Sequence, residues 1–295
     1  MIQDITPYRF HNEFQKKEPA PENYFFSFRE QKILLLSRQD GEYCLPTFRD
    51  LQQNLSDIAD LVVYLFSIDD IPLYLVKSQN VLDLSGDRLE YAPIHMLTLV
   101  KQEWLYFAAI TASHLSCWYA QNTYCGRCGD VMEHVPGQRA MICNNCGSII
   151  YPQIAPVVMI AVVNDDKLLL TKYAGRLLPQ WVLIAGFVEI GETIEDAAKR
   201  EVFEETGIRI KNLKYFGSQP WGFSGSVIMG FIAELDGSDT IHLDHKELAD
   251  AVWHSRFQLP RELTDISITY EMIEALRLNK KEAENEYIRN RNDMQ

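Results

Sequence analysis

Residues 186–208 read GFVEIGETIEDAAKREVFEETGI, a stretch that is rich in Asp and Glu and poor in basic residues. Thr193 followed by Asp196 has the form of a capping box, and Gly207 stands where a helix would end. This pattern predicts a helix over residues 194–206, which starts just after a glycine-containing loop.

The predicted helix directs several acids toward its apolar side. At 100° per residue, Glu201 and Glu205 lie about 20° on either side of Ile194, and Glu204 lies about 80° away. A solvated acidic face is the plain alternative, but other charged residues already occupy the opposite side of the helix. Carboxylates that face the protein body need protons, partners or a metal ion. Glutamates with this spacing supply hard oxygen ligands for Mg²⁺ or Mn²⁺, so the helix predicts a metal site for phosphate chemistry.

The same stretch resembles the Nudix box, G-x5-E-x7-R-E-U-x-E-E-x-G-U with U aliphatic. Gly186, Glu192 and the run 200–208 meet every fixed position. The resemblance implies an α/β/α sandwich with a mixed sheet, and a hydrolase of nucleoside diphosphates linked to another moiety. In such an enzyme Arg200 would orient the carboxylates and Glu192 would support the loop or the metal shell. The implied ligands of the catalytic metal are Glu201, Glu204 and Glu205.

A second motif follows the box. Residues 217–226, GSQPWGFSGS, resemble the SQPWPFPxS signature of NADH pyrophosphatases. Gly222 and Ser224 replace two prolines of that signature, which weakens the argument for a rigid loop. A Trp-containing turn that packs on the sheet is the alternative interpretation. The matching residues that the resemblance assigns to the substrate are Ser218, Gln219, Trp221, Phe223 and Ser226.

Four of the six cysteines form two Cys-x-x-Cys pairs with fourteen residues between the pairs. The four are Cys125, Cys128, Cys143 and Cys146. Each pair is followed by a glycine that permits a tight knuckle, so the pattern predicts four thiolates around one tetrahedral zinc. We favour a structural staple over a nucleic-acid or protein contact, because protein ligands fill every position. Cys44 and Cys117 are predicted to be small core residues.

The order of parts adds to the resemblance, since NADH pyrophosphatases carry a β-rich N-terminal region, a four-cysteine ribbon and then the Nudix domain. We expect a β-rich domain ending in a helix over 1–118, the ribbon over 119–152, the Nudix domain over 153–280 and a charged tail over 281–295. The resemblance implies base stacking by Phe187 and Tyr151, a further metal ligand in Glu247, and a homodimer. A packed aromatic for Tyr151 and an exposed surface acid for Glu247 remain open.

Composition limits the class of protein. The formal net charge of −13 argues against a broad surface that follows nucleic-acid phosphates, although a metal ion can reverse the local field for a small phosphorylated substrate. The sequence shows neither a signal peptide nor a membrane-spanning stretch, so we expect a cytoplasmic protein without a membrane partner.

Together these patterns predict a metal-dependent hydrolase that cleaves NADH or NAD⁺ to nicotinamide mononucleotide and AMP, and that removes NAD caps from RNA. A Nudix hydrolase that prefers ADP-ribose or another dinucleotide is the first alternative. A nucleotide-sensing regulatory protein is the second, but such proteins tend to lose box acids and all of them are present here.

Overall fold

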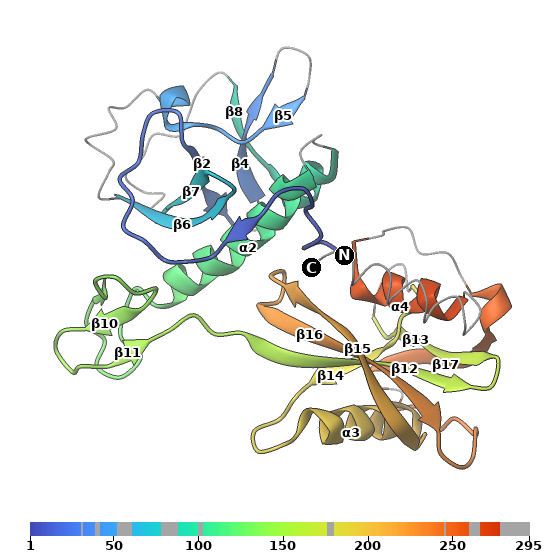
Figure 1. Ribbon diagram of the computed structural model, residues 1–295. Coiled ribbons are helices and arrows are strands. Elements are labelled where there is room, and N and C mark those ends of the chain that lie inside the picture. The colour runs from blue at the N-terminus through green and yellow to red at the C-terminus, as the bar shows by residue number, and fades with distance from the viewer. Residues whose placement is uncertain are drawn as a thin grey trace. The chain divides into compact units, whose positions relative to one another are not determined.

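The computed structural model describes residues 1–30, 32–38, 42–51, 61–77, 88–99, 103–175, 180–244, 246–259 and 266–277. The predicted tail 281–295 lies outside the described residues. Contacts divide the chain into two units (Figure 1): Met1–Ile2, Ala155–Trp221 and Ser226–Gln295 form the first, and Gln3–Ile154 with Gly222–Gly225 form the second. The finer domain division stays a prediction. Among the described residues, no helix is long and apolar enough to cross a membrane.

The first unit is built on a six-stranded mixed sheet with the order β15-β16-β12-β13-β17, where β14 pairs with β12. Only the β12–β16 pair of this sheet is parallel, from Ala155↔Ser226 to Val163↔Glu234. The strands are β12 (Ala155–Asn164), β13 (Lys167–Tyr173), β14 (Ile184–Phe187), β15 (Ile210–Trp221), β16 (Ser226–Leu235) and β17 (Leu248–Ser255). An Asn-Asp-Asp turn at residues 164–166 joins β12 and β13 into an antiparallel hairpin.

A helix covers each face of this sheet, as Figure 1 shows. Side chains alternate along a strand, so Val158 and Ile160 of β12 pack in the core that contains Val202 of helix α3 (Ile194–Thr206). Met159 and Ala161 pack on the other side, against helix α4 (Ile268–Arg277). This arrangement confirms the predicted α/β/α sandwich.

Helix α3 has the bounds that the sequence predicts. The Thr193 hydroxyl accepts a hydrogen bond from the Asp196 amide at 3.1 Å. Gly207 ends the helix in the left-handed region at φ 69°, which glycine adopts without strain. Both ends of the helix are therefore determined locally, and its register fixes which acids face the sheet.

The second unit holds two small sheets, β1-β6-β7-β2 and β3-β4-β5 with β8 on β4. The strands are β1 (Phe10–His11), β2 (Tyr24–Phe26), β3 (Phe28–Arg29), β4 (Lys32–Ser37), β5 (Tyr43–Cys44), β6 (Val62–Ile68), β7 (Ile71–Val76) and β8 (Leu89–Pro93). The predicted β-rich character is confirmed for the described residues. A 3₁₀ helix, Ile94–Leu99, follows β8 directly.

Helix α2 (Glu103–Gln121) leads from these sheets to a three-stranded ribbon of β9 (Met132–His134), β10 (Met141–Cys143) and β11 (Ile149–Ile150). Arg139 of the ribbon donates hydrogen bonds to the Asn12 side chain at 2.9 Å and to the Leu65 carbonyl, which ties the ribbon to the sheet. Cys117 on α2 is exposed, so its predicted place in the core is wrong, whereas Cys44 is partly buried.

Candidate active site

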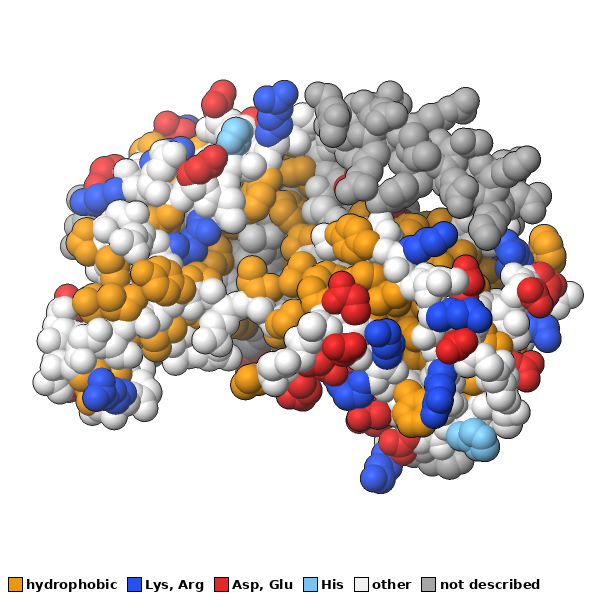
Figure 2. Space-filling view, turned by 60° about the horizontal axis from the view of Figure 1, so that its bottom comes forward, with side chains coloured by type: hydrophobic (Ala, Val, Ile, Leu, Met, Phe, Trp, Pro, Cys, Tyr) orange, Lys and Arg blue, Asp and Glu red, His pale blue; other side chains and the backbone are white. Residues whose placement is uncertain are grey.

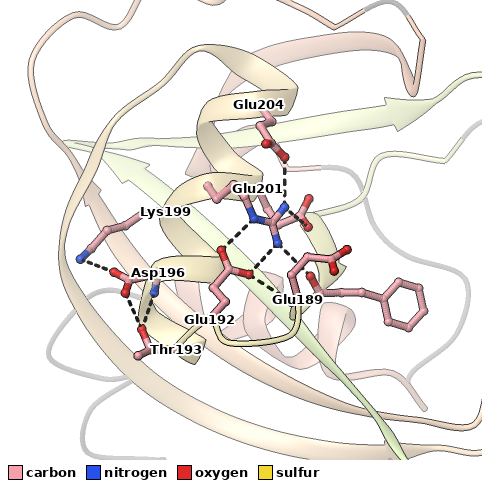
Figure 3. A network of polar contacts seen from close by, with 9 residues as sticks. Glu189, Glu192, Thr193, Asp196, Lys199, Glu201 and Glu204 are labelled. Atoms are coloured by element: carbon pink, nitrogen blue, oxygen red, sulfur yellow. Dashed lines mark hydrogen bonds and ion pairs between the residues drawn. The ribbon is translucent and has the colours of Figure 1, made fainter.

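Arg200 of α3 is the centre of a polar network in the first unit. Its guanidinium donates to both carboxylate oxygens of Glu192, at 2.8 and 2.9 Å, and to Glu201 at 2.7 Å and Glu204 at 3.0 Å (Figure 3). A fifth hydrogen bond reaches the Phe187 carbonyl at 3.0 Å. The planar fork of arginine can hold several oxygens at fixed angles, so Arg200 positions the box acids relative to the loop before α3.

Charge and burial act in opposite directions on these acids. The hydrogen bonds from Arg200 lower the pKa of Glu192. Burial raises the pKa of Glu201, against the lowering effect of the same guanidinium. The pKa of Glu201 is raised overall, because the effect of burial exceeds that of the Arg200 guanidinium.

The acids open onto a pocket of about 590 Å³. It is lined by Ala185, Gly186, Phe187, Glu189, Arg200, Glu201, Glu204, Glu205, Asp244 and Glu247. Gly186 leaves room for the Glu201 carboxyl group, because a Cβ at position 186 would overlap that group. The Phe187 side chain is 54% exposed at the same edge, where a flat group could stack on it.

Glu205 is the most deeply placed acid of the pocket, with 4% of its surface exposed. Burial, followed by the negative charges of Glu201, Glu247 and Asp244, raises the pKa of Glu205 to about 8. Its Oε2 atom is buried and has no hydrogen-bond partner among the described residues. A carboxylate oxygen in this state is costly unless a proton or a cation compensates it.

The donor set fits hard divalent cations. Several carboxylates line a pocket that is open to solvent, and Glu205, whose Oε2 atom has no hydrogen-bond partner among the described residues, is one of them. Mg²⁺ and Mn²⁺ prefer such oxygen ligands and retain coordination positions for water and phosphate. The residues present are therefore suited to metal-assisted chemistry on a phosphorylated substrate.

The four paired cysteines of the second unit come together. Their Sγ atoms all lie within 4.8 Å of one another. Gly129 and Gly147 follow the pairs in the left-handed region, and their amides donate to the carbonyls of Cys125 and Cys143 at 2.8 Å each. This is the geometry of a structural zinc site with four thiolate ligands.

Both the cysteine ribbon and the region that contains the candidate active site match known protein families. The NADH pyrophosphatase zinc ribbon domain model matches residues 120–151, and the NUDIX domain model matches residues 153–276. The NAD-capped RNA hydrolase NudC of Shigella boydii serotype 18 is 39% identical over 189 residues, which span 64% of this chain and 70% of that protein. The chain belongs to the zinc-ribbon NADH pyrophosphatase family of Nudix hydrolases. The NAD-capped RNA hydrolase NudC of Escherichia fergusonii is 43% identical over the same shares of both chains.

Among solved structures, a NUDIX hydrolase from Nitrosomonas europaea covers 54% of this Nudix hydrolase and 93% of its own chain. It has a TM-score of 0.45 and 22% sequence identity.

The residues of the NADH pyrophosphatase signature have diverse surroundings. Gln219 is fully buried; its amide donates to the Ile266 carbonyl at 2.7 Å and accepts from the Ile268 amide at 2.8 Å, so it holds the start of α4. Ser226 is also buried, Ser218 is exposed and Trp221 is partly buried, all in the first unit. The surroundings of Gln219 indicate a structural role for its amide.

Two aromatic residues of the predicted substrate site belong to the second unit. Phe223 is 46% exposed, and its ring centroid lies 6.3 Å from that of Tyr106 on α2. Tyr151 is 54% exposed, and its hydroxyl donates to Gln138 at 3.1 Å. Both rings therefore have an accessible face.

Two acids of the pocket were not predicted from the sequence of this Nudix hydrolase. Glu189 lies within the box at a position that the motif leaves unspecified, and Asp244 precedes Glu247 by three residues. The Asp244 amide donates to the Glu205 carbonyl at 3.0 Å, which places it beside the end of α3. The only sequence signal for Asp244 is its closeness to Glu247.

Proposed function

We propose that this Nudix hydrolase cleaves the pyrophosphate bond of NADH or NAD⁺ to nicotinamide mononucleotide and AMP, and that it removes NAD caps from RNA. The observation that carries the proposal is the orphaned, buried oxygen of Glu205 in a pocket with four further glutamates, of which Glu201, Glu204 and Glu247 are the proposed ligands. The relatives named NAD-capped RNA hydrolase support the choice of substrate.

We propose Mg²⁺ or Mn²⁺ as the catalytic ion, with Glu201, Glu204, Glu205 and Glu247 as ligands. When bound, the cation would supply positive charge against the charge that develops on the pyrophosphate and would lower the pKa of water.

The chain's own residues position and move the other groups. Arg200 holds Glu201 and Glu204 in fixed orientations, and it couples them to the loop through the Phe187 carbonyl. A carboxylate of the pocket accepts a proton from a water molecule. At the same time, the oxygen of that water bonds to one phosphorus of the pyrophosphate. The bond from that phosphorus to the bridging oxygen breaks, and the leaving phosphate retains the bridging oxygen.

Base recognition is proposed for the aromatic side chains. Phe187 and Tyr151 would stack on a flat base, and Trp221 and Phe223 would add apolar surface, with Ser218 as a polar contact. Gln219 and Ser226 would act by shaping the loop, because both are buried. A homodimer and a cytoplasmic location complete the proposal.

A preference for ADP-ribose is the second candidate, and the altered signature supports it. Gly222 and Ser224 stand where the NADH pyrophosphatase signature has prolines. A loop of different shape at the nicotinamide-recognition motif could favour a dinucleotide without that ring.

The test combines a substrate panel with two variants. Purified protein is incubated with NADH, NAD⁺ and ADP-ribose, each with Mg²⁺ or Mn²⁺, and products are separated by chromatography. Glu204→Gln and Glu205→Gln are expected to lower kcat by about 100-fold or more with the fold intact. Glu195→Gln, on the exposed side of the same helix, is the control. Full activity in both pocket variants would contradict the metal assignment, and faster cleavage of ADP-ribose would select the second candidate.

A further inference from the structure

A second pocket lies at the end of α3 in the first unit, with a volume of about 440 Å³. It is lined by Gly207, Arg209, Asp236, Gly237, Ser238, Thr240 and His242. It shares no residue with the catalytic pocket, and the proposed hydrolysis uses none of its side chains.

Among the described residues that line this pocket, Arg209 is a cation that no carboxylate offsets. Lys211 pairs with Asp236 at 3.3 Å, which offsets the pocket's acid. Arg209 is exposed, and its guanidinium carbon lies 5.8 Å from the Phe203 ring. Within the part of the chain that the structure describes, no carboxylate forms an ion pair with Arg209. On the face shown in Figure 2, Lys and Arg side chains lie among acidic ones. An anion site on that face would therefore depend on a few neighbouring side chains and not on a broad basic surface.

The end of a helix normally repels anions, because its last carbonyls carry partial negative charge. Here neighbouring amides occupy these carbonyls. The His242 amide donates to Thr206 at 2.8 Å, and the Asp244 amide donates to Glu205 at 3.0 Å. The repulsion is therefore reduced at the place where Arg209 and the His242 imidazole line the pocket.

The rim of the pocket is held in place. The Asp236 amide donates to the Arg209 carbonyl at 2.8 Å, and the Trp253 indole donates to the Asp239 carbonyl at 2.9 Å. The Thr240 amide donates to the Ser238 hydroxyl at 3.2 Å. The Ser238 hydroxyl donates to the Thr240 hydroxyl at 3.0 Å, so a guanidinium, an imidazole and the Thr240 hydroxyl on a fixed rim form a donor set that suits phosphate oxygens.

One short segment contributes to both pockets. His242 lines the second pocket and Asp244 lines the catalytic pocket, and the backbone of this segment is bonded to the end of α3. The segment 242–244 therefore contributes a residue to each pocket. We propose that the second pocket binds a phosphate group, and that this phosphate belongs to the RNA chain that follows an NAD cap. The RNA source rests on the proposed function.

The experiment compares two substrates in variants of Arg209. kcat/KM is measured for NAD⁺ and for a short NAD-capped single-stranded RNA with wild type and Arg209→Gln. The variant is expected to lower kcat/KM for the capped RNA by roughly two- to ten-fold through KM, and to leave NAD⁺ unchanged. The slope of log(kcat/KM) against log salt should become shallower by about 0.7 for one lost phosphate contact on a single strand. Lys199→Gln removes a positive charge from the exposed side of α3 and should change neither substrate's kinetics.

The outcomes separate this proposal from the proposed function. An equal effect of Arg209→Gln on both substrates, or no effect on either, overturns the RNA source, and if inorganic phosphate also acts alike on wild type and variant, it overturns the phosphate site. If inorganic phosphate changes NAD⁺ hydrolysis in wild type but not in Arg209→Gln, and the capped RNA shows no selective loss, the pocket takes free phosphate and the RNA source is wrong. If wild type cleaves neither substrate, the proposed function fails. Fluorescence anisotropy with a 5′-monophosphate RNA then tests the pocket, and equal affinity in wild type and Arg209→Gln overturns it.

Discussion

Gly186 and Glu201 occupy one small volume, with the carboxyl group of Glu201 standing where any other residue at position 186 would place its Cβ. The glycine of the Nudix box therefore makes room for an acid fifteen residues further along the chain. This contact connects the end of β14 to the middle of α3.

Gly186→Ala should displace the Glu201 carboxyl group and lower kcat/KM for the preferred dinucleotide by about 100-fold, because small errors in the position of catalytic groups are costly. Steady-state kinetics and thermal unfolding together measure the effect. Gly217→Ala is the control, since a methyl group there meets nothing within 4 Å. Normal kinetics in Gly186→Ala would mean that Glu201 can move without loss.

Gly222→Ala should destabilise the second unit by about 1–3 kcal/mol, as overpacking does in a close contact. The added Cβ would lie 2.7 Å from the Ile110 carbonyl oxygen of α2, and a backbone atom cannot move aside as a side chain can. Urea unfolding measures the change. The same contact would oppose proline at position 222, so Gly222→Pro should also destabilise the protein; a more stable proline variant would contradict the packing argument.

Cys128→Ser should remove zinc and lower the free energy of unfolding by several kcal/mol, because zinc binding contributes to folding in small modules of this kind. Elemental analysis and thermal unfolding are the measurements. Cys117→Ser is the matched control, since Cys117 is also exposed but lies outside the cluster of four. Zinc at the wild-type level in Cys128→Ser would exclude this thiolate as a required ligand.

His134 should make the second unit less stable at acid pH. Burial, with the charge of Lys77, lowers the pKa of His134 from 6.5 to about 4. Above pH 6.5 the imidazole is neutral in both states. As the pH falls from 6.5 to 4, the unfolded chain takes up a proton that the folded chain refuses, so the free energy of unfolding decreases.

His134→Phe should remove this part of the pH dependence while it keeps a ring beside Tyr119, whose centroid lies 5.1 Å away. Urea unfolding from pH 7 to pH 4 compares the variant with wild type and with His11→Phe on an exposed strand. Loss of zinc at acid pH would lower the free energy of unfolding of wild type and variant alike, so it cancels in the difference between their two curves. Parallel curves for wild type and His134→Phe would rule out His134 as the cause.

Local signals made much of the fold predictable. The caps of α3 are short-range interactions of Thr193 and Gly207, so the sequence alone indicates both ends of the helix. The Cys-x-x-Cys spacing likewise contains most of the geometry of the thiolate cluster.

Residues whose roles depend on distant partners were harder to predict. Gln219 belongs to a signature, but its buried amide is bonded to residues 266 and 268, and no local pattern reveals that pairing. Asp244 reaches the catalytic pocket through a backbone bond to the end of α3. Cys117 sits in an apolar run whose helical phase turns it outward, which composition does not show.

Alternate side chains of β12 pack on the two faces of the sheet, which limits where residues can be inserted into the chain. One extra residue between Val158 and Ile160 would turn every later side chain of the strand to the opposite face, so that each layer would receive residues shaped for the other. Insertions should therefore be tolerated in the turn at Asp165 and Asp166 and rejected within the strand. The first unit would gain new loops at its margins far more readily than a new residue at its centre.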